Sequence, residues 1–155
     1  MAKKKSSRNA LVRFLFLMYC AVMLLLLFDR PSAWAEGGNY RQLLEMSTNL
    51  KPLYTINNYI TVIRRNTEPA LVRHCAINLA GNILLFIPAG FLLPRIFPNQ
   101  QKFFLFLLTC FLSILLVETA QLFSLLGSFD VDDLILNLSG MILGFAIYRI
   151  RHPKS

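Results

Sequence analysis

Long apolar stretches with almost no charge restrict what this 155-residue chain can fold into. Hydrophobic residues make up 55% of the sequence, above the fraction typical of soluble domains. At a rise of about 1.5 Å per residue, roughly 20 residues cross the ~30 Å hydrocarbon core of a bilayer. Four stretches approach or exceed that length: Leu11–Phe28, Ile77–Phe97, Phe103–Leu126 and Leu134–Ile150. The pattern excludes a water-soluble globule and a disordered chain.

These stretches predict an all-α, polytopic membrane helix bundle with four spanning helices. Backbone amides in lipid have no water to bond, and runs this long and uniformly apolar lack the alternation of barrel strands. Residues 29–76 are too few and too polar at their start for a second domain. Within them Leu53, Ile56, Ile60 and Ile63 recur at helical spacing, which predicts an outer amphipathic interfacial helix that lies along the membrane surface.

The basic residues predict the orientation of the bundle. Ten of the 16 lysines and arginines fall on segments that alternate to one side, and these segments carry no Asp or Glu. The positive-inside rule makes that side cytoplasmic, so both termini are expected in the cytoplasm. The net charge of +8 does not indicate nucleic-acid binding, because the basic residues flank the spans and most phenylalanines lie inside them.

The first stretch fits two interpretations. Basic residues precede an apolar core, and Ala33-Trp34-Ala35 before Glu36 resembles the small-x-small cleavage site of a secretory signal peptide. The stretch is also long enough to remain as an anchor helix. Both alternatives deliver residue 36 to the outer side, so the rest of the topology is the same.

Polar side chains occupy the outer halves of the last three spans, at helical spacing. An ionised side chain at mid-membrane costs about 2.5–3.5 kcal/mol to insert, so these residues must face one another or a watery pocket. The three strips are His74, Asn78 and Asn82; Glu118 and Gln121; and Asp130, Asp133 and Asn137. We expect them to meet in an outward-facing polar pocket.

Small residues and prolines predict how the spans pack. Gly140 and Gly144 form a small-x-x-x-small pair, and Gly81 is a further candidate for close helix packing. Pro88 and Pro94 each remove one backbone hydrogen bond, which predicts that the second span is kinked or broken below its polar strip.

Three motifs of the sequence resemble those of a known family. Residues 78–94 read N-x-x-G-N-x-x-x-F-x-P-x-G-x-x-x-P, residues 118–140 contain E-x-x-Q and then D-x-D-D-x-x-x-N-x-x-G, and residues 49–56 read N-x-x-P-x-x-T-I. In this order the motifs resemble the VanZ-like membrane proteins. The resemblance divides the chain into an N-terminal anchor helix and outer linker (1–48), a VanZ-like membrane domain (49–148) and a basic cytoplasmic tail (149–155).

The resemblance implies a bacterial cell-envelope protein of the cytoplasmic (inner) membrane, in a group named for a member that confers low-level resistance to the glycopeptide teicoplanin. One detail departs from the family: the loop before the aspartates often carries a basic residue, whereas this chain has Gly127-Ser128. A mechanism that needs a cation from this loop therefore finds none here.

Three functions fit these observations. The first is a binding module for an envelope amphiphile, with membrane lipids and a cell-wall precursor or glycopeptide-related ligand as the expected partners. The residues expected to bind it are Asn78, Asn82, Glu118, Gln121, Asp130, Asp133 and Asn137. The second is a divalent-metal-dependent enzyme acting on envelope lipids, with Glu118, Asp130, Asp132 and Asp133 as oxygen ligands. The third is a structural partner protein whose polar cluster serves packing only.

Overall fold

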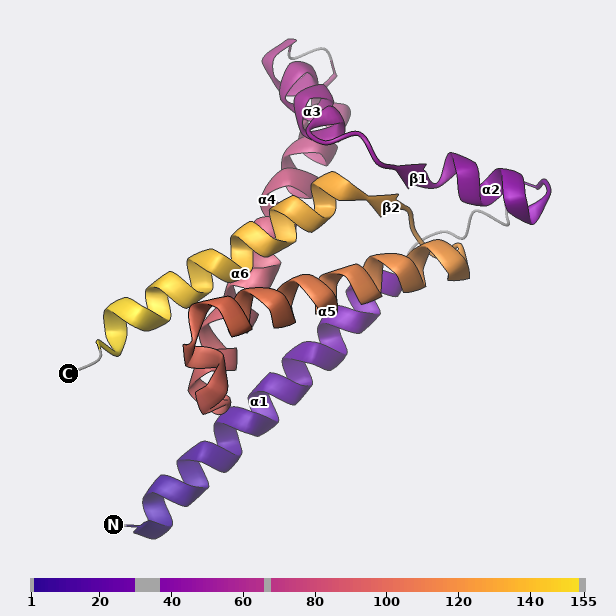
Figure 1. Cartoon of the computed structure of the whole chain (residues 1–155). Coiled ribbons are helices and arrows are strands. Elements are labelled where there is room, and N and C mark those ends of the chain that lie inside the picture. The colour runs from indigo at the N-terminus through magenta and orange to yellow at the C-terminus, as the bar shows by residue number, and fades with distance from the viewer. Residues whose placement is uncertain (1, 30–36, 66–67, 154–155) are drawn as a thin grey trace.

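The computed structural model describes residues 2–29, 37–65 and 68–153, and almost all of this part of the chain is helical (Figure 1). The helices are α1 (Ala2–Phe28), α2 (Tyr40–Met46), α3 (Tyr54–Arg65), α4 (Pro69–Ile96), α5 (Phe103–Ser124) and α6 (Val131–Arg151), with a short 3-10 helix, η2, at Pro98–Gln101. Two short strands, β1 (Thr48–Asn49) and β2 (Phe129–Asp130), pair in parallel. The predicted all-α class is confirmed.

Four of the described helices are long and apolar enough to cross a membrane, as predicted: Ala10–Phe28 within α1, and the whole of α4, α5 and α6. Large apolar side chains cover their outsides; Leu25 is 71% exposed and Phe104 is 82% exposed. In water such surfaces would be unfavourable, so they are suited to lipid. The second spanning helix, α4, starts at Pro69 rather than at the predicted Ile77, because the helix extends beyond its apolar run on the N-terminal side.

The α4–α6 pair forms the centre of the bundle. A Cβ atom added at Gly140 would overlap with the carbonyl oxygen of Ile83, and one at Gly144 would overlap with that of Ile87. The backbones of the two helices therefore touch, as expected for a small-x-x-x-small pair. The contact positions increase together along both helices, so α4 and α6 run in the same direction.

The expectation that Gly81 packs closely against a neighbouring helix was wrong. A Cβ atom at Gly81 would meet no heavy atom within 4 Å, so this glycine is not a packing device. Gly90 is one instead, since a Cβ atom there would overlap with the carbonyl oxygen of Met141. Of the predicted kink or break below the polar strip, the break is excluded, because α4 continues as one helix through Pro88 and Pro94 to Ile96.

The helices α1 and α5 complete the bundle around this pair. The Tyr19 hydroxyl of α1 donates to the Leu85 carbonyl of α4, on the turn before Pro88. Phe106, Cys110 and Ile114 of α5 are at most 2% exposed and belong to one apolar core. That core also includes Met23 and Leu27 of α1, Phe86 and Ala89 of α4, and Met141 and Phe145 of α6.

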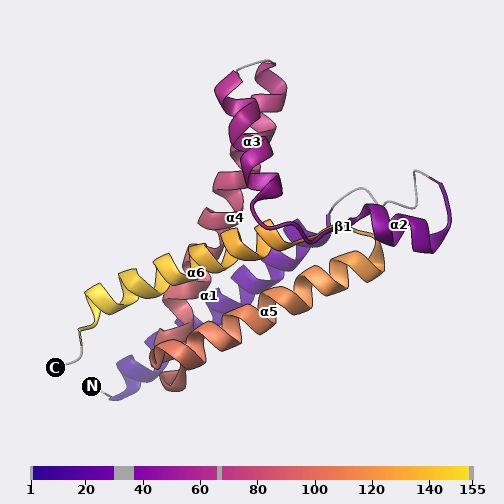
Figure 2. The same ribbon diagram turned by 45° about the horizontal axis from the view of Figure 1, so that its top comes forward.

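Residues 37–65 form an outer segment at the end of the molecule opposite both termini (Figures 1 and 2). The predicted amphipathic helix is present as α3. Its axis follows the first turns of α4, against which it packs (Figure 2), so it forms a hairpin with α4 rather than a cover across the helix ends. The short helix α2 and the β1–β2 pairing were not predicted.

Candidate functional site

The candidate site lies where the outer segment meets the start of α6. Here β1 pairs with β2, with Thr48 opposite Phe129 and Asn49 opposite Asp130. The Phe129 amide also donates to the Ser47 carbonyl at 2.8 Å. This pairing sets the residues of the N-x-x-P-x-x-T-I motif beside those of the D-x-D-D motif. We call this contact region the aspartate junction, formed by Asn49, residues 53–56 and Asp130–Asp133, together with Asn82 of α4.

The first aspartate of the junction, Asp130, is the N-cap of α6. Its Oδ1 accepts from the Asp132 amide at 2.9 Å and from Asn49 Nδ2 at 3.2 Å. Its Oδ2 accepts from the Thr55 hydroxyl at 2.6 Å. The carboxylate therefore satisfies the first turn of α6 and at the same time holds β1 and α3 in place.

The second aspartate, Asp132, performs the same task for α3. Its two carboxylate oxygens accept from the backbone amides of Leu53, at 2.5 Å, and of Ile56, at 3.0 Å. These amides belong to the start of α3 and have no partner within that helix. Leu53 has a φ of 62°, a left-handed conformation that turns its amide toward α6. Asp132 is fully buried, so it serves as a cap supplied from another helix.

The third aspartate, Asp133, connects α6 to α4. Its Oδ1 accepts a hydrogen bond from Asn82 Nδ2. Asn82 is 8% exposed, on the face of α4 that approaches α6. The three aspartates thus hold different parts of the chain to the start of α6. Asp130 binds β1 and Thr55, Asp132 binds the first turn of α3, and Asp133 binds α4.

The structure brings only part of the predicted polar set together. A hydrogen bond joins Asn82 and Asp133, which are both members of the set. Gln121 faces α1 instead, where its amide donates to the Leu27 carbonyl at 2.7 Å. Asn78 bonds along its own helix to the His74 carbonyl at 3.0 Å.

The two remaining members of the set are buried in the spans. Glu118 of α5 is 3% exposed and Asn137 of α6 is 2% exposed. The Asn137 side-chain oxygen accepts no hydrogen bond from the described part of the chain. Asn137 lies one turn after Asp133, so it extends the polar face of α6 into the bundle.

Sequence reasoning placed Asp132 only in the metal alternative and did not include Asn49 or Thr55. The sequence signal for these three residues was their place in the N-x-x-P-x-x-T-I and D-x-D-D motifs. No helical spacing accounts for polar residues at those positions. The metal alternative finds no support in residues 2–29, 37–65 and 68–153, which contain no group of three His, Cys, Asp or Glu side chains placed to hold a metal ion. The oxygens of Asp130 and Asp132 already accept hydrogen bonds from the protein.

Two hollows can be described near the ends of the bundle. One lies beside the aspartate junction and is lined by Leu44, Glu45, Thr48, Asn49, Leu50 and Lys51. The other lies between α1 and α4 at the end near the chain termini, lined by Val12, Arg13, Arg95 and Ile96. Neither is lined by the polar set predicted from the spans.

The comparison with known families agrees with these motifs. The VanZ/LLP1 family model matches residues 14–152, from the first span to the end of the last. The chain belongs to the VanZ/LLP1 family. No curated protein and no solved structure matches it. In this VanZ/LLP1 protein, the family motifs on the outer segment, α4 and α6 are therefore the residues that build the aspartate junction.

Proposed function

We propose that this VanZ/LLP1 protein binds an envelope amphiphile, a lipid headgroup or a cell-wall precursor, at its outward end, and that this binding reduces sensitivity to glycopeptides such as teicoplanin. The proposal places the protein in the bacterial cytoplasmic membrane with both termini in the cytoplasm. The distribution of basic residues supports that orientation. The aspartate junction and its hollow then face the cell wall.

The observation that carries the proposal is the hollow beside the junction. Glu45 and Lys51 give its lining both signs of charge, which suits a headgroup with carboxylate and ammonium groups. Leu50, also in the lining, is 67% exposed, and Met46 nearby is 76% exposed. A hollow that combines charged side chains with a mostly apolar lining fits an amphiphile whose tail stays in lipid.

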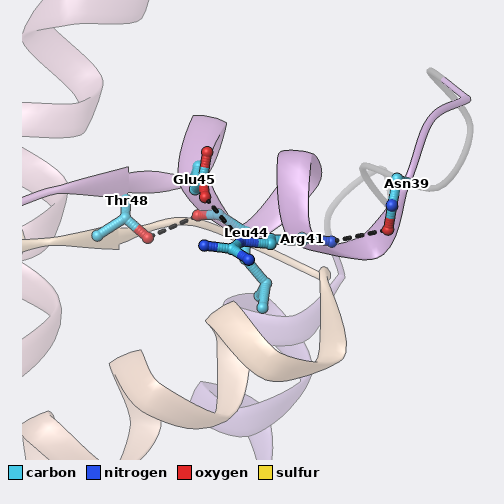
Figure 3. A network of polar contacts seen from close by, with 5 residues as sticks. All are labelled: Asn39, Arg41, Leu44, Glu45 and Thr48. Atoms are coloured by element: carbon cyan, nitrogen blue, oxygen red, sulfur yellow. Dashed lines mark hydrogen bonds and ion pairs between the residues drawn. The ribbon is translucent and has the colours of Figure 1, made fainter.

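Local structure holds this hollow in shape. Asn39 caps α2 by accepting from the Arg41 amide at 3.3 Å, and Arg41 pairs with Glu45 at 3.2 Å (Figure 3). The Thr48 hydroxyl donates to the Leu44 carbonyl at 2.6 Å, which joins the end of α2 to β1 (Figure 3). Asn49 belongs to both the hollow and the junction. In the proposal, Asn82 supports the junction beside the hollow through its hydrogen bond to Asp133.

A test compares variants in a teicoplanin-susceptible bacterium that expresses the full chain. Lys51→Gln and Glu45→Gln should abolish the decrease in teicoplanin sensitivity without lowering the amount of protein in the membrane. Arg64→Gln, an exposed residue of α3 outside the hollow, is the matched control and should keep the phenotype. A direct measurement titrates the purified protein in phosphatidylcholine nanodiscs with a polyprenyl-linked muropeptide. Full phenotype and full binding in both hollow variants would refute the proposal.

A structural role is the second candidate function, and one observation favours it. Every carboxylate oxygen of Asp130 and Asp132 accepts a hydrogen bond from another part of the chain, as expected of groups that fix packing. In that case the protein acts through partners. Asp132→Asn should then lower the amount of protein in the membrane, whereas Lys51→Gln should change nothing.

A further inference from the structure

The second hollow lies at the opposite end of the bundle, between α1 and α4, and it is basic. Arg13 of α1 and Arg95 of α4 line it together with Val12 and Ile96. Neither arginine forms an ion pair within the described part of the chain; the ion pair found there joins Arg41 to Glu45. Two arginines therefore line one hollow, and none of its described lining residues is acidic.

Helix packing brings these two arginines together. The bond from Tyr19 to the Leu85 carbonyl joins α1 to α4 in the middle of the bundle. The two helices run in opposite directions, since α1 begins and α4 ends toward the same end of the molecule (Figures 1 and 2). Arg13 lies about 9 Å and Arg95 about 15 Å from this bond along the helix axes. Both residues therefore lie toward the same end of their spans, the end near the two chain termini.

The acidic side chains of the described chain do not neutralise this hollow. Asp29 follows the other end of α1, Glu118 lies in the last two turns of α5, and the three aspartates start α6. Glu45 and Glu68 belong to the outer segment and the start of α4. Two cations without a counter-charge repel each other, so a bound anion would stabilise their arrangement.

We propose that this hollow binds the phosphate group of an anionic phospholipid from the leaflet at the end where both termini lie. Arginine presents donors in a planar fork that matches phosphate oxygens, and two arginines from different helices can hold one phosphate. The surroundings favour a lipid over free phosphate. Leu11 is 56%, Phe14 58% and Phe97 49% exposed, which offers acyl chains an apolar surface beside the phosphate. This site is independent of the outward hollow.

The test uses the full chain purified in detergent and native mass spectrometry with two lipids that share acyl chains, phosphatidylglycerol and phosphatidylcholine. A basic residue near a membrane surface strengthens binding of anionic lipid by about five-fold, so two should favour phosphatidylglycerol by about 25-fold. Arg13→Gln and Arg95→Gln should each weaken its binding by about five-fold. Arg151→Gln removes an exposed charge from the last residue of α6 and is the matched control, with no expected change.

Several outcomes would overturn the proposal. Equal binding of both lipids by the unaltered protein would remove the preference for anionic headgroups. An equal loss in Arg151→Gln would mean that general surface charge attracts the lipid. Displacement of phosphatidylglycerol by an equal concentration of inorganic phosphate would assign the hollow to free phosphate. If either glutamine variant fails to insert, the double variant Arg13→Lys and Arg95→Lys, which keeps both charges, should retain the preference for phosphatidylglycerol, and its loss would contradict the proposal.

Discussion

The cap that Asp132 provides for α3 allows the sharpest prediction. Asp132→Asn keeps the shape of the side chain but replaces one acceptor oxygen with an NH2 group, which points at a backbone amide. One of the two bonds, to Leu53 or to Ile56, is then lost, and the other loses its charge assistance. Hydrogen bonds to a charged group contribute about 1.5–3 kcal/mol, and neutral ones about 1 kcal/mol. The contact between α3 and α6 should weaken by about 2–5 kcal/mol.

This loss should appear as local opening of the start of α3, because the four spanning helices keep their own contacts. Each 1.4 kcal/mol is a factor of ten, so amides of residues 53–58 should exchange with deuterium about 30-fold to 4,000-fold faster in the variant. Hydrogen–deuterium exchange followed by mass spectrometry of the detergent-purified protein measures this. Arg151→Gln, an exposed change at the far end of α6, is the control. Unchanged exchange at residues 53–58 in Asp132→Asn would refute the cap.

Three further predictions address packing, topology and the polar set. Gly144→Ala should destabilise the α4–α6 contact by about 1–3 kcal/mol, because the added Cβ atom overlaps with the Ile87 carbonyl oxygen. Gly81→Ala, the control, should be neutral or stabilising. The temperature of thermal aggregation in detergent compares the two variants, and equal shifts would contradict the close approach of α4 and α6. The intact mass of the membrane protein should include residues 1–35, because Tyr19 and Leu27 of α1 bond to α4 and α5; a mass that starts at Glu36 would show cleavage. Glu118→Gln should leave the protein inserted but abolish the teicoplanin phenotype if the polar set supports binding, and a retained phenotype at normal abundance would exclude that role.

The spans and their class could be predicted because lipid imposes a length and excludes charge over that length. The meeting of Asn82 and Asp133 followed from the same argument, since both polar groups had to turn inward from α4 and α6. The Gly140 and Gly144 contacts followed from residue spacing. In each case, the helical period and the apolar solvent leave few directions in which a polar or small residue can face.

The rest of the site depends on features without a periodic signal. The left-handed Leu53 aims its amide at Asp132, and no spacing rule indicates a left-handed leucine. Gln121 bonds to the Leu27 carbonyl because of the rotation of α5 about its own axis, which its uniformly apolar sequence does not specify. Gly81 and Gly90 look alike in sequence, and only the crossing point of α4 and α6 distinguishes them.

The most direct test of the aspartate junction is a cross-link across the β1–β2 pair. Thr48→Cys combined with Phe129→Cys places thiols on residues that face each other in the parallel pair, within reach of a disulfide. Thr48→Cys combined with Ser124→Cys is the control. The native Cys75 and Cys110 are buried, and the partly exposed Cys20 is replaced by serine in both proteins. After mild oxidation of membranes, peptide mapping should find residues 48 and 129 joined in most molecules. If residue 48 instead remains free, or joins other sites as often as 129, the outer segment is not held at the start of α6.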